Sequence, residues 1–227
     1  MTTRFLLLRH AEAAGNAAGE TQGRIDHELT ERGRCQAATV AASLTPYHPA
    51  ALYCSPAARA RSTAAAVATA CGLRAVADER LLEVDHGELD GLTGEQLREQ
   101  HGPVLDQWRE HGFSDLRFPG GESMSEAQAR MLGALDEIAE RYPDADVVVV
   151  SHNLALKSLL AHALGVPLAA QRRFQLDLAS LSVVERRPGE DGEDGEDGED
   201  GGAARWSVVG LNERCHLPAQ PPAQPPS

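Results

Sequence analysis

The sequence has 227 residues, of which 42% are apolar and 24% are charged, and its formal net charge at pH 7 is −13. A chain of this length and composition can bury one sizeable hydrophobic core, whereas its apolar stretches fall short of the roughly 18 residues that a membrane-spanning helix needs. The excess of carboxylates argues against a nucleic-acid partner, and four scattered cysteines without a CxxC pair favour a cytoplasmic protein with reduced thiols over a disulfide framework or a zinc site.

The first part of the chain predicts alternating strands and helices. Residues 4–9 begin with a continuous apolar run, which is typical of a strand that is buried on both faces of a parallel sheet. Residues 29–44 predict a helix that starts near Thr30, and residues 51–54 predict a second short strand. The Ser-Pro pair at 55–56 has the pattern of an N-cap followed by proline in the first helical position. We therefore expect an alanine-rich helix from this pair to about Ala70.

The middle of the chain continues this alternation. Residues 92–111 predict a mostly polar helix. The SMSE segment at 123–126 resembles a capping box and predicts a helix that ends near Arg141. The DVVVV run at 146–150 predicts another strongly buried strand, and residues 153–164 predict the helix that follows it.

The last part of the chain contains two stretches that are unlike a folded core. Residues 188–203 include four copies of the triplet Gly-Glu-Asp, which offer no apolar side chain to bury, so we expect a disordered acidic loop there. Removing the eight carboxylates of these triplets changes the formal charge from −13 to −5. Strands are predicted on either side of this loop, over 174–185 and 205–210, and residues 217–227 predict a loose proline-rich tail.

Strands that alternate with helices predict an α/β fold, here a three-layer α/β/α sandwich around a mostly parallel central sheet. We expect a single domain over residues 1–216, with a helical insertion or lid over 85–120. In such sheets ligands bind beyond the carboxyl ends of the strands. The side chains that follow the strands are therefore the candidates for a functional site.

Basic and polar side chains follow three of the predicted strands. Arg9 and His10 end the first strand, Arg59 lies one turn into the helix after the second, and His152 with Asn153 follows the DVVVV strand. If these strands are neighbours, two arginines and two histidines converge on one rim. Guanidinium groups and helix N-termini match phosphate oxygens, so this rim predicts a phosphate site.

The order and spacing of these segments resemble the histidine phosphatase superfamily of phosphoglycerate-mutase-like phosphatases. RHAEAAGN is similar to the family's Arg-His-Gly-Glu-Thr segment with its downstream Asn, and TQGRIDHELTERG to the stretch that follows it. SPAARARSTA, LLEVDHGELDG, PGGES and VVVVSHN resemble four later motifs in the same order, over residues 4 to about 184. Three residues depart from the family pattern, namely Ala11, Ala13 and Asn153.

The resemblance implies a metal-independent phosphatase that hydrolyses a small phosphomonoester through a phosphohistidine intermediate. His10 would be the nucleophile, while Arg9, Arg59 and His152 would hold the phosphoryl oxygens. Glu83 would protonate the leaving group and then take a proton from water. The expected substrate-binding residues are Asn16, Gln22, Gly23 and Asn153. This assignment makes the chain a phosphoric monoester hydrolase of the histidine acid phosphatase type.

The expected partner is a small phosphorylated metabolite, with no cofactor, no metal ion, no nucleic acid and no membrane. One alternative is a phosphoglycerate mutase, although residues 14–28 lack the aromatic side chains by which mutases of this family resemble one another. Another alternative is a non-catalytic binding or regulatory module on the same fold. The sequence leaves open the physiological substrate, the oligomeric state and the role of the acidic triplets.

Overall fold

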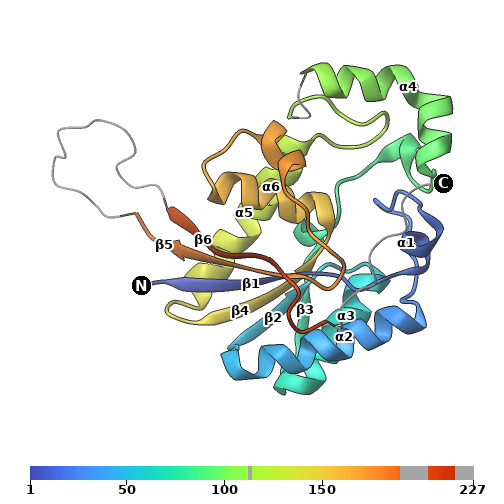
Figure 1. Ribbon diagram of the computed structural model, residues 1–227. Coiled ribbons are helices and arrows are strands. Elements are labelled where there is room, and N and C mark those ends of the chain that lie inside the picture. Colours follow the sequence, from blue (N-terminus) through green and yellow to red (C-terminus); the bar gives the residue numbers. More distant parts are fainter. Residues whose placement is uncertain (112–113, 190–203, 218–227) are drawn as a thin grey trace, which may run out of the picture.

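The computed structural model describes residues 1–111, 114–189 and 204–217, and a mixed six-stranded sheet forms its centre (Figure 1). The strands are β1 (Thr3–Arg9), β2 (Ala51–Cys54), β3 (Ala75–Ala77), β4 (Asp146–Ser151), β5 (Leu181–Arg187) and β6 (Arg205–Glu213). The α-helices are α1 (Ala14–Ala18), α2 (Glu31–Leu44), α3 (Ala58–Cys71), α4 (Gly94–His111), α5 (Met124–Arg141) and α6 (Asn153–Ala163). The short 3-10 helices are η1 (Thr45–Tyr47), η2 (Glu79–Leu81), η3 (Gly87–Leu89) and η4 (Leu168–Arg173).

The strands lie in the order β3-β2-β4-β1-β5-β6. The first four strands of that order are parallel to one another, whereas β5 runs antiparallel to β1, and β6 antiparallel to β5. The predicted, mostly parallel sheet is therefore confirmed. Because β4 lies between β2 and β1, the three strand ends that carry the basic side chains are neighbours.

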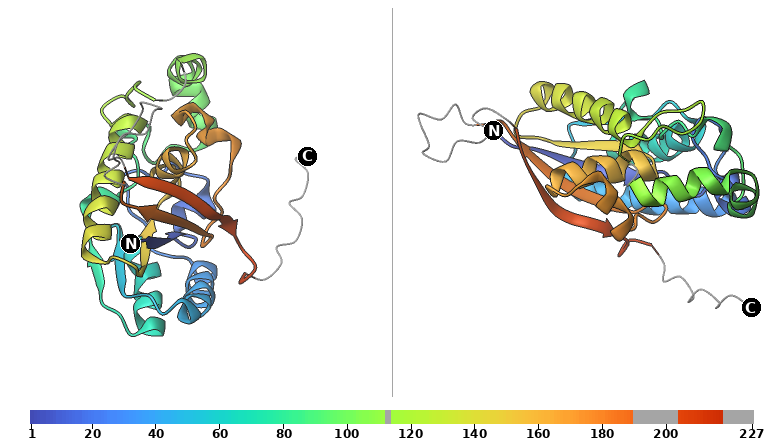
Figure 2. Two further views of the ribbon diagram at one scale, coloured as in Figure 1. Left: turned by 90° about the vertical axis from the view of Figure 1, so that its left-hand side faces the viewer. Right: turned by 90° about the horizontal axis from the view of Figure 1, so that it is seen from above.

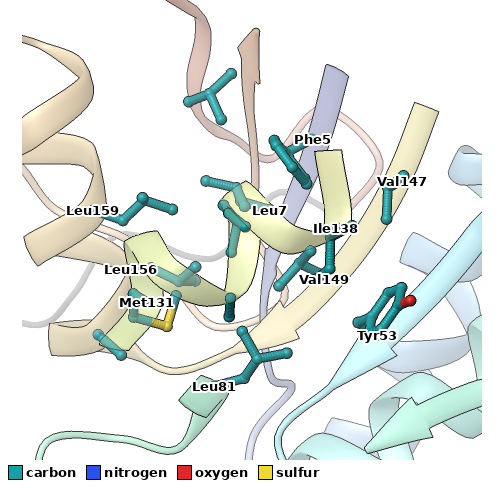
Figure 3. Close-up of a cluster of buried hydrophobic side chains, with 14 of the residues drawn as sticks. Phe5, Leu7, Tyr53, Leu81, Met131, Ile138, Val147, Val149, Leu156 and Leu159 are labelled. Carbon is teal, nitrogen blue, oxygen red and sulfur yellow. The ribbon is translucent and has the colours of Figure 1, made fainter. Parts of the chain in front are cut away.

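Helices cover both faces of the sheet and complete three layers (Figures 1 and 2). Successive strand residues point to opposite faces. Phe5 and Leu7 pack with residues of α5 and α6, as Figure 3 shows, whereas Leu6 and Leu8 pack with residues of α2 and α3. This double burial explains the continuous apolar run of β1 and confirms the predicted α/β/α sandwich.

Two predicted helix starts are confirmed, and one is wrong. The Thr30 side chain accepts a hydrogen bond from the N–H of Gly33 at the start of α2, and Ser123 forms the capping box of α5. Ser55 is not an N-cap, because α3 begins only at Ala58. The Ala58 N–H donates instead to the carboxylate of Asp26 at 2.7 Å, a partner far away in the sequence.

The predicted strand over 174–185 is wrong in its first half, because β5 begins at Leu181. Ala179 has a φ of 55°, in the left-handed region, and this turn interrupts any extended strand. The Ala179 N–H donates to the carbonyl of His10 at 3.2 Å, so the turn lies against the end of β1. The short elements α1 and β3 were not predicted at all.

Segment 85–120 contains α4, whose helical geometry is broken at His101, two residues before Pro103. Figure 1 shows α4 beyond the end of the sheet toward which β1 and β4 run. Most of the predicted acidic loop (190–203) and proline-rich tail (218–227) lies outside the described residues. No helix within the described ranges is both long enough and apolar enough to cross a membrane.

Candidate active site

A cavity of about 300 Å³ opens at the carboxyl ends of β1 and β4, a size at the lower end of the ~300–1,000 Å³ typical of small-molecule sites. Its polar wall includes Arg9, His10, Asn16, Gln22, Glu83 and Asn153. Its apolar wall consists of Leu89, Leu97, Leu105, Trp108, Phe118 and Leu154. Segment 85–120 supplies every apolar member except Leu154. The cavity thus combines a polar floor at the strand ends with an apolar wall from the segment that contains α4.

His10 is held with one imidazole nitrogen engaged. Its backbone N–H donates to the carbonyl of Ser151 at 3.0 Å, which fixes the residue at the junction of β1 and β4. Its Nδ1 lies 2.8 Å from the carbonyl oxygen of Ala11. Because a carbonyl can only accept, this contact assigns the proton of the neutral ring to Nδ1. The free lone pair of the neutral ring is then on Nε2.

The surroundings of His10 keep its ring neutral. Burial, followed by the positive charges of Arg9 and Arg59, lowers the pKa of His10 well below its ordinary value of 6.5. His10 is only 3% exposed, so water offers little compensation for a charge there. At neutral pH the imidazole is therefore in the form that can attack an electrophile.

His152 faces His10 from the end of β4. The two ring centroids lie 5.1 Å apart, at an interplanar angle of 58°. Arg59 Nε donates to His152 Nδ1 at 3.2 Å, so Nε2 carries the proton of the neutral ring and donates to the Ser55 hydroxyl at 2.7 Å. Burial, then the charge of Arg59, lowers the pKa of His152 well below 6.5.

The two arginines differ in their surroundings. Arg9 lines the cavity and donates from Nη1 to the carbonyl of Leu176 at 2.6 Å, while its buried Nε has no hydrogen-bond partner in the described part of the chain. Arg59 is fully buried behind the cavity wall and donates from Nη2 to the carbonyls of Gln22 and Gly23, at 3.1 Å each. Arg59 therefore holds the loop that contains two of the predicted substrate contacts.

Gly23 itself is packed away from the cavity. A Cβ at this position would lie 2.8 Å from the carbonyl oxygen of Val84, so the backbone of Gly23 approaches that residue too closely for any side chain. Gln22 lines the cavity and is only 8% exposed, yet neither atom of its amide has a hydrogen-bond partner among the described residues. A buried amide without a partner costs about 1–3 kcal/mol, which a ligand in the cavity would recover.

Asn16 and Asn153 reach the cavity from helix starts. The Asn16 side-chain oxygen accepts from the N–H of Ala13 at 3.0 Å, so its NH₂ group carries the hydrogens that a ligand could accept. Asn153 is the first residue of α6. His86 and Glu20 also line the cavity but were not predicted from the sequence. His86 lies within the LLEVDHGELDG motif, and its place in that motif could have indicated that it belongs to the site.

Glu83 reaches the same cavity and is only 5% exposed. Its Oε1 accepts from the N–H groups of Val84 and Ala155, at 2.9 Å each, and its Oε2 accepts from Leu154 at 3.1 Å. Two of these donors belong to the first turn of α6, where N–H groups have no partner within the helix. The carboxylate is thus fixed opposite the end of β1. Among the described residues, no cluster of three or more His, Cys, Asp or Glu side chains is arranged to hold a metal ion.

Known proteins resemble this chain in sequence over most of its length. The sequence profile of the histidine phosphatase superfamily (branch 1) matches residues 5–192. The chain belongs to the histidine phosphatase superfamily. Phosphoserine phosphatase 1 of Hydrogenobacter thermophilus is 36% identical over 214 residues, which cover 94% of each chain. The probable phosphoglycerate mutase GpmB of Yersinia pestis is 39% identical over 182 residues, covering 79% of this chain and 83% of the relative.

Solved structures of similar proteins share the fold of this superfamily member over nearly its whole length. A mycobacterial glucosyl-3-phosphoglycerate phosphatase, solved in complex with VO3, has a TM-score of 0.79 at 28% identity and covers 93% of this chain and 99% of its own. YhfR of Bacillus stearothermophilus also has a TM-score of 0.79 at 28% identity, covering 94% and 98%. The relatives of this chain thus include both phosphatases and a mutase-like protein.

Proposed function

We propose that this superfamily member is a metal-independent phosphatase that hydrolyses a small phosphomonoester through a phosphohistidine on His10. The observation that carries the proposal is the neutral imidazole of His10, 5.1 Å from that of His152, in a cavity that the Glu83 carboxyl group also lines. A nucleophile and a proton donor that reach the same cavity are the groups that such a transfer needs.

In the first step, Nε2 of His10 attacks phosphorus in line with the ester oxygen. The P–N bond forms as the P–O bond breaks, and Glu83, in its protonated form, transfers a proton to the departing oxygen. The positive charge of Arg9 opposes the negative charge that gathers on the phosphoryl oxygens, and Asn16 donates to one of them. Arg59 and His152, which the family resemblance assigned to the phosphoryl oxygens, do not line the cavity and are bonded to each other, so in this proposal they support the floor from behind.

In the second step, the ionised Glu83 takes a proton from a water molecule as that water attacks phosphorus. The P–N bond breaks, inorganic phosphate leaves, and both His10 and Glu83 return to their starting protonation states. The substrate-binding part of the cavity would be formed by Gln22 and Asn153 together with the apolar wall. Its volume of about 300 Å³ favours a small organic group on the phosphate.

The test is phosphate release from p-nitrophenyl phosphate, phosphoserine, 3-phosphoglycerate and glucosyl-3-phosphoglycerate, the last three chosen from the names of the relatives. His10→Asn should lower kcat/KM by more than about 1,000-fold because the nucleophile is lost. His162→Asn, an exposed histidine of α6, is the matched control and should leave kcat/KM unchanged. Mass spectrometry after rapid alkaline quenching should find the phosphoryl group on His10, and full turnover by His10→Asn would refute the proposal.

A phosphoglycerate mutase is the second candidate, favoured by the 39% identity to the probable mutase GpmB. A mutase would return the phosphoryl group from His10 to a hydroxyl of the bound substrate instead of to water. Conversion of 3-phosphoglycerate to its isomer, faster than release of inorganic phosphate, would establish the mutase and reject the phosphatase.

A further inference from the structure

The PGGES segment (residues 119–123) lies against the loop that carries Glu83. The Glu122 N–H donates to the carbonyl of Asp85 at 3.0 Å, and the Asp85 N–H donates back to Glu122 Oε1 at 2.9 Å. A Cβ on Gly121 would come within 2.1 Å of the Asp85 carbonyl oxygen, so this approach requires glycine. The segment therefore has a structural partner in the Glu83 loop, although it does not line the cavity itself.

Arg130 of α5 binds the same loop through three backbone carbonyls. Its Nη1 donates to the carbonyls of Arg80 and Leu82, at 2.7 Å each, and its Nη2 donates to that of Glu83 at 3.0 Å. Residues 83–86 belong to no helix or strand, so no regular ladder of backbone hydrogen bonds fixes them. The guanidinium group replaces that ladder on one side of the loop.

Glu122 holds the guanidinium in place. Its Oε2 accepts from Arg130 Nε at 3.1 Å, and its Oε1 accepts from Nη2 at 2.5 Å, which makes a bidentate pair. The two side chains are only 18% and 15% exposed, so their charges stabilise each other, and Arg24 Nη2 lies 3.7 Å from the same oxygen of Glu122. The PGGES turn, Glu122 and Arg130 form one connected support behind the main chain of Glu83.

We propose that Arg130 and Glu122 are positioning residues that aim the Glu83 carboxyl group at the leaving oxygen, an inference that rests on the proposed phosphatase function. The Arg130 bond fixes the Glu83 main chain, while the N–H groups of Leu154 and Ala155 fix the far end of its side chain. Loss of the first anchor lets the main chain drift, and a displacement of about 1 Å can cost about 100-fold in rate.

The test compares kcat/KM for two substrates whose leaving groups differ in whether they need a proton from a general acid. Glycerol 2-phosphate releases an alkoxide that needs a general acid, whereas p-nitrophenyl phosphate releases a stabilised phenolate that does not. Arg130→Met should lower kcat/KM for glycerol 2-phosphate by about 100-fold and for p-nitrophenyl phosphate by less than about fivefold. Glu83→Gln should show the same selectivity, and combining the two changes should add little further loss.

Arg186→Met is the matched control. Arg186 lies on β5, and its side chain is 14% exposed, as deeply buried as that of Arg130. It pairs with Asp136 of α5, so its replacement removes an arginine ion pair away from the cavity. It should leave the ratio of the two kcat/KM values unchanged. Should Arg130→Met fail to fold, Arg130→Lys and Glu122→Gln are measured in the same way and should shift the ratio in the same direction.

A purely structural role predicts that both substrates lose activity in equal proportion. Equal losses, or an unaltered ratio in all the Arg130 and Glu122 variants, would overturn the inference while the wild-type enzyme remains an active phosphatase. A wild-type protein that releases phosphate from neither substrate would instead overturn the proposed function, and this inference with it.

Discussion

Replacing Ser55 by alanine tests the hydrogen bonding behind His10 and His152. The Ser55 hydroxyl accepts the proton of His152 Nε2 at 2.7 Å, and both residues are fully buried. The variant leaves that N–H without a partner. A shift of the proton to Nδ1 would not restore a hydrogen bond, because Arg59 Nε already donates to that atom.

The expected cost follows from the buried donor. An unsatisfied buried polar group destabilises a protein by about 1–3 kcal/mol. The Ser55 hydroxyl also accepts, at 3.3 Å, from the N–H of Ala57, which loses this partner too. We therefore expect Ser55→Ala to lower the free energy of unfolding by about 2–3 kcal/mol, which is about 4–12 °C in Tm for a domain of this size.

Ser158→Ala is the control, because this serine is equally buried but donates only to the carbonyl of Ala155 in its own helix. No donor is stranded there, so its unfolding free energy should stay within about 0.5 kcal/mol of the wild type. Both variants are compared by urea unfolding at pH 8, where His152, whose pKa is lowered on folding, is neutral in the folded and the unfolded chain. Equal stability of the two variants would refute the assigned proton on Nε2.

Two further predictions concern pH and the cavity loop. Folding lowers the pKa values of His10 and His152, so the unfolded chain binds more protons than the folded chain below pH 6.5. The free energy of unfolding should therefore fall with decreasing pH, by up to about 2.7 kcal/mol per pH unit for two protons. A free energy of unfolding that stays constant from pH 7.5 to 5.5, measured with urea, would contradict this prediction. Asp90 accepts hydrogen bonds from the N–H groups of Gly23, Arg24 and Ile25, at 2.6 Å each. Asp90→Ala should therefore destabilise the fold by about 2–3 kcal/mol and raise KM. An unchanged free energy of unfolding together with an unchanged KM would exclude a role of Asp90 in shaping the loop that contains Gln22 and Gly23.

Local sequence determined most of the secondary structure and the order of the motifs. A continuous apolar run can bury both faces of a strand, and this was sufficient to predict β1 and β4. Thr30 and Ser123 cap helices through atoms three residues away, so their effect is visible in a short window. The rule that ligands bind beyond the carboxyl ends of parallel strands indicated which side chains to consider, but Arg9, His10 and His152 come together only because β1 and β4 are neighbours in the sheet, which the strand order decided.

Other features depended on partners far away in the sequence. Ser55 resembled an N-cap, but its hydroxyl is used by His152, and the start of α3 is bonded to Asp26 instead. The tertiary structure also decided that Arg59 holds the Gln22 loop from behind the cavity and that Arg130 supports the Glu83 loop. The local sequence can determine a helix start because the hydrogen bonds of the cap join residues only a few positions apart. A buried polar side chain instead bonds to residues that the folded chain places beside it, and these can be far away in the sequence. The tertiary structure alone therefore decided the partners of Ser55, Arg59 and Arg130.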